Sequence, residues 1–233
     1  MIGGAVAVAI IVVVVAIVIS SGGAKKGGIQ TGAKASATVT AVNNLLNGIP
    51  QSGNTLGSPN APVTMTYYGD LKCPVCQAFT LQGGFGQLVS NDVRAGKVKV
   101  VYDAFCTATC SGPDPNEFPV QQAAALAAGK QNKFWQFTEL FYRQQESETD
   151  AYVTTAFLDR LARQVTGLNF AQWNSARTDP NLTAEVTSQQ NGGRAIGVSG
   201  TPTLIFKGPK GQAAANAAVP TYAQLQAAIK QVT

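Results

Sequence analysis

Alternating apolar and polar residues predict three strands along this chain. The pattern runs through PVTMTYY (62–68), KVKVVYDAF (97–105) and TPTLIFKG (201–208). Between the first two, a segment that begins at Pro74 has apolar residues at helical spacing and is interrupted at Gly83–Gly84. A strand, a helix and a second strand in this order predict a right-handed parallel unit.

Helical periodicity dominates the middle of the chain and returns at its end. The middle has an alanine-rich stretch, a stretch rich in phenylalanine, a third amphipathic stretch and a fourth that Gly192–Gly193 weakens. These cover residues 119–129, 130–146, 157–167 and 182–196. Residues 208–219 are predicted to be a turn or a poorly ordered loop, and residues 220–232 a final helix. The order βαβ, helical block, strand, helix indicates an α/β fold.

The N-terminal residues form a separate region. Residues 2–19 carry no charge and are rich in Val and Ile, and a helix of that length spans about 27 Å, close to the thickness of a bilayer core. A signal-peptide core would be shorter and end at a small-residue cleavage site, so we expect a transmembrane anchor over residues 1–20. The Gly-, Ala-, Ser-, Thr- and Lys-rich residues 21–44 predict a flexible linker, and residues 45–233 the folded domain.

The composition favours a folded domain, with 45% hydrophobic and 12% charged residues. The net charge of +5 comes mainly from the linker, since the chain from Ser58 onward has 14 basic and 12 acidic residues. No basic stripe alternates with aromatic residues, so a nucleic-acid partner is not expected.

The lysines and the cysteines predict different compartments for the folded domain. Lysines that follow the hydrophobic run favour a cytoplasmic domain, whereas four cysteines in two close pairs favour an oxidising compartment. A few linker lysines are the weaker signal. We therefore expect an extracytoplasmic domain on the cytoplasmic membrane, with the hypothesis that a basic N-terminal segment is absent from this sequence.

The 233 residues include no histidine. This excludes the commonest general base and metal ligand, and every catalytic pair of cysteine or serine with histidine.

The motif Cys73-Pro74-Val75-Cys76 carries the candidate chemistry. Pro74 favours the first helical position, which makes Cys73 the N-cap. Backbone N–H groups and the helix dipole then favour a thiolate, the nucleophilic form, at Cys73. Cys76 lies close enough to expel a mixed-disulfide partner. A lone C-x-x-C motif also fits a small structural disulfide or part of a metal site.

The second pair, Cys106 and Cys110, allows several interpretations. Four cysteines can bind zinc, but 29 residues separate the two pairs, more than the roughly 15 to 20 of a zinc ribbon, so we expect no metal. No helix start is signalled at Cys106, which favours a small structural disulfide over a second redox pair.

The stretch GVSGTPTLIF (197–206) places a proline directly before an apolar strand. A cis peptide bond at Thr201–Pro202 would explain it, because a cis bond makes a tight bend and leaves the Thr201 backbone exposed.

With GSPNAPVTMTYYGDLKCPVCQAF upstream and GVSGTPTLIF downstream, the chain resembles the DsbA-like branch of the thioredoxin superfamily, especially its membrane-anchored bacterial members. The likeness covers about residues 46–232. It implies a thioredoxin-like fold with a helical subdomain inserted at about 112–192, preceded by the transmembrane helix.

The resemblance also implies a role for individual residues. Cys73 matches the nucleophile, Cys76 the resolving cysteine, and Pro74 and Val75 the dipeptide that tunes the reduction potential. Pro202 matches the cis-proline beside the disulfide, and Thr201 the residue whose backbone pairs with substrate.

Two positions depart from the family pattern. Val75 stands where DsbA often has a histidine that stabilises the thiolate, and Tyr67 where a buried acid often assists proton transfer. Asp70 matches an acidic position of anchored members. These departures predict a milder oxidant than DsbA.

The implied function is exchange of disulfides with reduced secreted or surface polypeptides, without a cofactor. A quinone-linked partner of the DsbB or vitamin K epoxide reductase type would reoxidise the pair. The alternatives are a reductase or isomerase kept reduced by a membrane partner, and a binding or chaperone module whose disulfides are structural.

Overall fold

The computed structural model describes residues 28–233. The transmembrane segment predicted over residues 1–20 lies outside this range. No helix within the range is long and apolar enough to cross a membrane.

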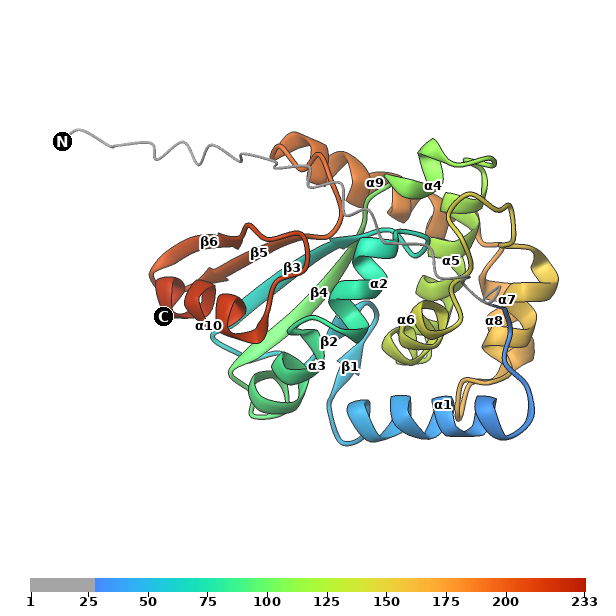
Figure 1. Ribbon diagram of the computed structural model, residues 1–233, viewed down its shortest axis with the longest axis horizontal. Helices are drawn as coiled ribbons and strands as arrows, with labels where there is room; N and C mark the ends of the chain where they lie inside the picture. The colour runs from blue at the N-terminus through green and yellow to red at the C-terminus, as the bar shows by residue number, and fades with distance from the viewer. Residues whose placement is uncertain (1–27) are drawn as a thin grey trace, which may run out of the picture.

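A six-stranded sheet lies at the centre of the fold (Figure 1), in the order β1-β2-β4-β3-β5-β6. The strands are β1 (Gln51–Ser52), β2 (Thr55–Leu56), β3 (Val63–Gly69), β4 (Val98–Ala104), β5 (Thr203–Gly208) and β6 (Gly211–Ala215). As predicted, β3 and β4 pair in parallel, from Val63 opposite Val98 to Gly69 opposite Ala104. β5 pairs antiparallel with β3, so it forms the other neighbour of the central strand.

Helices surround this sheet, and those between β4 and β5 form the predicted helical insertion. The helices are α1 (Gly32–Leu46), α2 (Pro74–Leu81), α3 (Phe85–Leu88), the π-helical turn η1 (Val89–Val93), α4 (Ala108–Ser111), α5 (Glu117–Gly129), α6 (Phe134–Arg143), α7 (Thr155–Ala162), α8 (Phe170–Ala176), α9 (Pro180–Ala195) and α10 (Tyr222–Val232). α5 to α8 lie together to one side of the sheet, next to α2 (Figure 1). The sequence thus predicts the α/β fold and its inserted helices.

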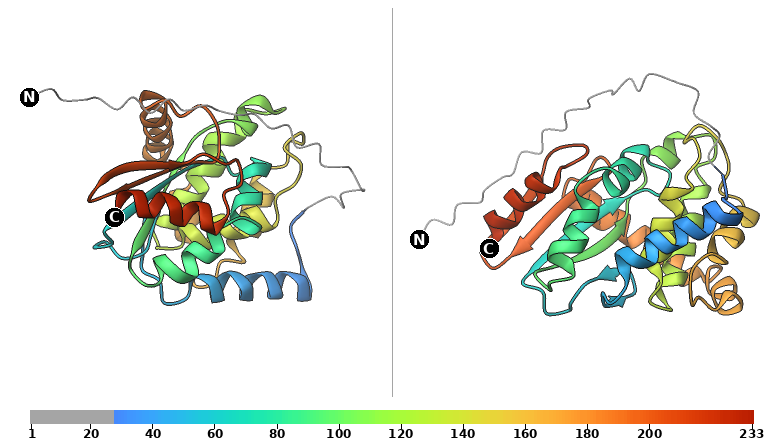
Figure 2. Two further views of the ribbon diagram at one scale, coloured as in Figure 1. Left: turned by 60° about the vertical axis from the view of Figure 1, so that its left-hand side comes forward. Right: turned by 60° about the horizontal axis from the view of Figure 1, so that its bottom comes forward.

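The two faces of β3 pack against different helices. Tyr67 faces α2, and its ring contacts Phe79 at a centroid distance of 5.4 Å. The next residue, Tyr68, points to the opposite face and forms a small buried cluster with Phe105 and Ile205. Figure 2 shows α10 and α9 on opposite sides of the sheet. Burial on both faces at this end of β3 is matched by two successive aromatic residues, whereas the first part of the strand alternates buried and half-buried positions.

The linker prediction for residues 21–44 is wrong for the part that forms α1. Val42 and Leu46 are buried, and α1 packs against α6. At the start of the described chain, Gln30 N–H donates to Gln144 Oε1 at 2.8 Å, and Gln30 Nε2 donates to the Arg143 carbonyl at 3.2 Å. The small and polar composition concealed this helix, because tertiary burial of a few residues stabilises it rather than helix propensity.

The loop prediction for residues 208–219 is also wrong in part, because β6 pairs with β5 from Leu204 opposite Ala215 to Gly208 opposite Gly211. Alanine is depleted in strands, so the residues of β6 carried no strand signal. Pairing with β5 supplies the backbone hydrogen bonds that make this segment an edge strand.

The two glycines of α9 have different environments, although the helix runs through both. A Cβ atom at Gly193 would lie 2.9 Å from Phe105 Cδ2 and 3.1 Å from Tyr68 Cε1. At Gly192 no atom would lie within 4 Å of such a Cβ. Gly193 therefore allows α9 to approach the sheet closely, while Gly192 only lowers helix propensity.

We predict that Gly193→Ala lowers the free energy of unfolding by about 1–2 kcal/mol, because overpacking outweighs the gain in helix propensity. The matched control Gly192→Ala should raise it by about 0.5–1 kcal/mol. Urea denaturation of both variants measures this. A change of the same sign in both would contradict the close approach of α9.

Candidate functional site

Cys73 lies at the N-terminus of α2, just beyond the carboxyl end of β3. Its N–H donates to the Asp70 carbonyl at 3.0 Å, and Pro74 occupies the start of the helix. The Cys76 N–H donates to Cys73 Sγ at 3.4 Å, so Cys73 is the N-cap. This bond is one of the backbone N–H contacts that the sequence predicts for an N-cap at Cys73.

The second motif meets the first at the same edge of the sheet. The Thr201–Pro202 peptide bond is cis, and β5 begins at the next residue. The Cys73 thiol donates to the Thr201 carbonyl at 3.4 Å, across 128 positions of sequence. The pairing of β5 beside β3 therefore brings Cys73, Cys76, Thr201 and Pro202 together.

The two thiols are free and have opposite electrostatic environments. A hydrogen bond from the Cys76 side chain lowers the pKa of Cys73, burial opposes it, and the Thr201 side chain and Cys76 N–H lower it further. Burial raises the pKa of Cys76 well above its usual value, and its hydrogen bond to Cys73 adds to this. Cys73 is 5% exposed and Cys76 is fully buried. Cys73 therefore has the properties of the nucleophile, and Cys76 those of a resolving thiol.

Tyr67, which the resemblance places where a buried acid is often found, lies beneath the C-x-x-C turn. Its hydroxyl lies 3.4 Å from the Cys76 carbonyl, 3.3 Å from Thr80 Oγ1 and 3.3 Å from the Tyr142 hydroxyl. Burial raises the pKa of Tyr67 and of Tyr142 well above the usual range. The site thus has neutral hydroxyl groups under Cys76 in place of a carboxylate.

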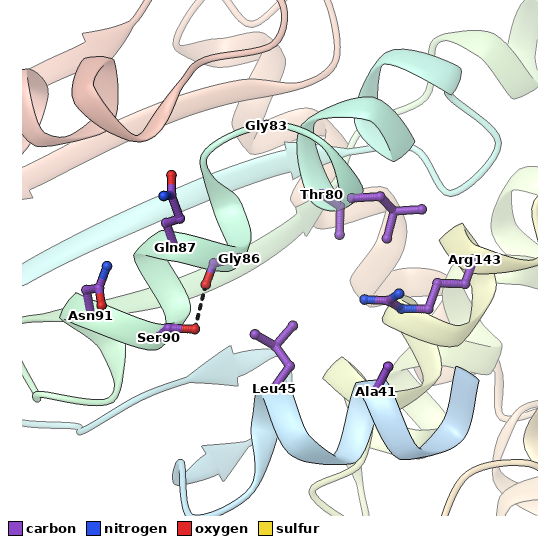
Figure 3. A pocket seen from close by; sticks show the side chains of 10 residues that line it. Ala41, Leu45, Thr80, Gly83, Gly86, Gln87, Ser90, Asn91 and Arg143 are labelled. Carbon is purple, nitrogen blue, oxygen red and sulfur yellow. Dashed lines mark hydrogen bonds between the residues drawn. The ribbon is translucent and has the colours of Figure 1, made fainter. Parts of the chain in front are cut away.

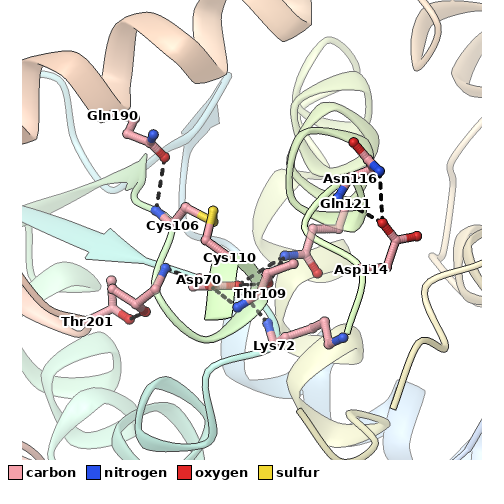
Figure 4. The surroundings of a disulfide bond; sticks show 11 residues. Asp70, Lys72, Cys106, Thr109, Cys110, Asp114, Asn116, Gln121, Gln190 and Thr201 are labelled. Carbon is pink, nitrogen blue, oxygen red and sulfur yellow. Dashed lines mark hydrogen bonds between the residues drawn. A yellow bond between two sulfur atoms is a disulfide. The ribbon is translucent and has the colours of Figure 1, made fainter. Parts of the chain in front are cut away.

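Asp70 is fully buried, and its carboxylate accepts hydrogen bonds from five donors around it (Figure 4). The donors are the N–H groups of Lys72, Thr107 and Thr109, the Thr109 hydroxyl and Gln121 Nε2. These bonds offset the cost of burying the charge. Asp70 is therefore tied to the loop that holds the second cysteine pair.

That second pair, Cys106 and Cys110, forms a disulfide with a Cα–Cα distance of 5.7 Å. Cys106 is buried, while Cys110 is exposed. The disulfide uses two of the four sulfur atoms that an all-cysteine zinc site would need.

Sequence reasoning missed a buried ion pair next to the nucleophile. Lys72 is fully buried, and its Nζ lies 2.5 Å from Glu117 Oε2 and 2.8 Å from the Asp150 carbonyl. Glu117 Oε1 accepts from the Val153 N–H at 2.7 Å. The two residues are 45 positions apart, and no local pattern links them. Thr107, whose hydroxyl is hydrogen-bonded to that of Thr201, was missed for the same reason.

A pocket of about 580 Å³ lies elsewhere, between α1, α3 and the C-terminal end of α2 (Figure 3). Leu45, Thr80, Gln87, Ser90 and Arg143 are among its lining residues. Cys73 caps the other end of α2, and none of the predicted site residues lines this pocket.

Comparison with known families matches residues 51–231 to the thioredoxin model. The chain belongs to this thioredoxin family. With a C-x-x-C pair at a helix N-terminus beside a cis-proline, this member is a thiol-disulfide oxidoreductase.

Curated relatives of this thioredoxin-family chain carry one name. This chain is 22% identical over 200 residues to the probable disulfide bond formation protein D of Bacillus anthracis, and the match covers 82% of this chain and 87% of the relative. It is 25% identical over 154 residues to disulfide bond formation protein D of Bacillus subtilis, covering 64% and 65%.

Solved structures support the fold of this family member. BdbD from Bacillus subtilis, in its oxidised form, superposes with a TM-score of 0.66 at 20% identity, covering 78% of this chain and 96% of that one. Chlamydia trachomatis DsbA superposes with a TM-score of 0.60 at 17% identity, covering 76% and 90%.

We predict that iodoacetamide alkylates Cys73 far faster than Cys76 in the native reduced protein. The rate at Cys73 should titrate with a pKa below the usual thiol value of about 8.5, since the thiolate is the reacting form. Mass spectrometry over a pH series measures both sites. Equal rates at the two cysteines in the folded protein would contradict this assignment, and the denatured protein serves as the control.

Proposed function

We propose that this chain is an extracytoplasmic thiol-disulfide oxidoreductase that introduces disulfides into secreted or surface polypeptides, anchored to the cytoplasmic membrane through residues 1–20. The observation that carries the proposal is the geometry of the pair: Cys73 is the N-cap of α2, the buried Cys76 donates its N–H to Cys73 Sγ, and the cis Thr201–Pro202 bond lies beside them. The pKa directions, lowered at Cys73 and raised at Cys76, agree with this geometry. Its relatives named for disulfide bond formation support the same direction.

The reaction begins with the Cys73–Cys76 disulfide. A substrate thiolate attacks Cys73 Sγ, the bond between the two cysteines breaks, and Cys76 leaves as a thiolate that takes up a proton. A second substrate thiolate then attacks the substrate sulfur of the mixed disulfide. The substrate gains a disulfide, and Cys73 leaves as a thiolate. Two electrons pass from the substrate to the cysteine pair.

The site stabilises that last leaving group. The Cys76 N–H donates to Cys73 Sγ, and the Thr201 side chain also lowers the pKa of Cys73. A stabilised thiolate makes the reduced form more favourable, which makes the pair a better oxidant. Pro74 and Val75 tune this balance, and Val75 cannot donate as a histidine would.

Substrate is bound beside Pro202. An extended polypeptide pairs with the backbone of Thr201, in the manner of strand addition. Cys73 Sγ lies against the Thr201 carbonyl, so a cysteine of the bound strand would be held next to the reactive sulfur.

Reoxidation requires a second protein, because each turnover leaves the Cys73–Cys76 pair reduced. A quinone-linked membrane partner of the DsbB or vitamin K epoxide reductase type would accept the two electrons. The competing direction, a reductase or isomerase, would need a partner that supplies electrons instead.

One observation weighs against a chaperone module that only holds unfolded chains. Among the described residues, the exposed large hydrophobic side chains are Val120 and Ile196. A surface that holds unfolded chains by hydrophobic contact needs a larger contiguous apolar patch.

We predict that the Cys73/Cys76 pair equilibrates with glutathione at a reduction potential less negative than the value of about −270 mV for thioredoxin. The lowered pKa of Cys73 is the physical reason. Tryptic mapping of the two thiols across a series of glutathione ratios measures the potential. A value at or below that of thioredoxin would establish the reductase direction instead.

We also predict that Cys76→Ala in the full chain accumulates mixed disulfides with cysteine-containing secreted or surface polypeptides, because the resolving thiol is missing. Non-reducing gels and mass spectrometry of the trapped partners measure this. The double variant Cys73→Ala, Cys76→Ala is the matched control and should trap none. Partners drawn only from the cytoplasm would contradict the proposed location.

A further inference from the structure

The loop from Cys106 to Cys110 has no part in the exchange steps above, yet it lies at the same edge of the sheet. It follows β4 directly, as the turn to Cys73 follows β3. Its disulfide closes a ring of five residues, and two residues of that ring, Thr107 and Thr109, contact Asp70.

Asp70 ties the loop firmly to the turn before the nucleophile. Its Oδ2 accepts from the Thr107 N–H at 3.0 Å and the Thr109 N–H at 2.9 Å, and its Oδ1 accepts from the Thr109 hydroxyl at 2.6 Å. The Asp70 carbonyl accepts from the Cys73 N–H. Position and orientation of the loop are thus fixed relative to Cys73.

The loop also reaches the cis-proline segment. The hydroxyls of Thr107 and Thr201 are hydrogen-bonded to each other. Each hydroxyl has a single proton to donate. Cys73 Sγ lies 3.4 Å from the carbonyl oxygen of the same residue, Thr201, which places the sulfur next to this threonine. If Thr107 donates to Thr201, the Thr201 proton is free to point toward Cys73 Sγ, which agrees with the Thr201 side chain lowering the pKa of Cys73.

We propose that Thr107 is a positioning residue, fixed by the Cys106–Cys110 disulfide and by Asp70, that orients the Thr201 hydroxyl as a donor to the Cys73 thiolate. The proposal rests on the proposed function, because it concerns the redox balance of the same pair. Hydrogen bonds in a chain polarise one another. A Thr107 hydroxyl that donates to the Thr201 hydroxyl therefore strengthens the hydrogen bond from Thr201 to the Cys73 thiolate.

The consequence is a more oxidising Cys73/Cys76 pair. Loss of the Thr107 donor weakens the stabilisation of the thiolate, which disfavours the reduced form of the pair. The reduction potential then becomes more negative.

The test is Thr107→Val, a substitution that removes the hydroxyl and keeps the backbone N–H that binds Asp70. We expect the equilibrium with glutathione to shift threefold to tenfold toward the protein disulfide, about 14 to 30 mV. The alkylation rate of Cys73 should titrate at a higher pH than in wild type. An unchanged potential, or a more oxidising one, would overturn the proposal.

Two variants separate positioning from general damage to the site. Thr107→Ser keeps the hydroxyl and should stay within twofold of wild type. Thr203→Val removes a threonine hydroxyl from the cis-proline segment that bonds to the Gly200 carbonyl instead, and it should also stay within twofold. A shift in Thr203→Val as large as in Thr107→Val would mean that the segment is merely disturbed.

The disulfide is tested in the same assay with Cys106→Ala, Cys110→Ala. This double variant should also shift the glutathione equilibrium toward the Cys73–Cys76 disulfide. Adding Thr107→Val to the double variant should change the equilibrium constant by less than twofold, because the disulfide and the Thr107 hydroxyl act through the same contact with Thr201. Additive shifts would show that the disulfide acts independently of Thr107.

The failure of this inference is distinguishable from failure of the proposed function. A wild-type potential at or below that of thioredoxin would refute the oxidase direction whatever the variants do. A wild-type oxidant with an unaltered Thr107→Val variant would refute only the role of Thr107.

Discussion

The parallel pairing of β3 with β4 is the constraint on which the site depends. Parallel strands in register end at the same edge of a sheet, and here Gly69 and Ala104 are the last pair. The chain that leaves β3 reaches Cys73 and the chain that leaves β4 reaches Cys106. Pairing of β5 on the other side of β3 brings Thr201 to the same edge. Three segments distant in sequence therefore meet in one place through strand pairing.

Charged side chains are buried at this edge, and each needs partners from the surrounding chain to offset the loss of its hydration. Asp70, Lys72 and Glu117 are all buried, and an unpaired charge in such a place would cost several kcal/mol. Each is satisfied by partners from other elements: Asp70 by the disulfide loop and α5, and Lys72 by Glu117 and the Asp150 carbonyl. The polar network thus ties the turn before Cys73 to the disulfide loop and to α5.

Local signals explain what could be predicted from the sequence. Pro74 marks the helix start that makes Cys73 an N-cap, and the proline of the Thr201–Pro202 pair stands where a strand would not tolerate it. The failures are contacts without local signals. α1 depends on burying Val42 and Leu46 on α6, β6 is built largely of alanine, and Thr107 meets Thr201 across 94 positions. Sequence reasoning found the reactive atoms more readily than the residues that hold them.

The hydrogen bonds of Gln30 have a consequence for how an anchored domain would be oriented. Gln30 is held by Arg143 and Gln144 at the end of α6, and the next residue, Gln145, donates to the carbonyls of Leu71 and Cys73. The chain therefore enters the fold beside the reactive edge and not at the far end of the sheet. With the proposed anchor before Gln30, the chain would join the membrane to the fold on the side of the reactive edge, which is also the side where a membrane-embedded electron acceptor would be needed.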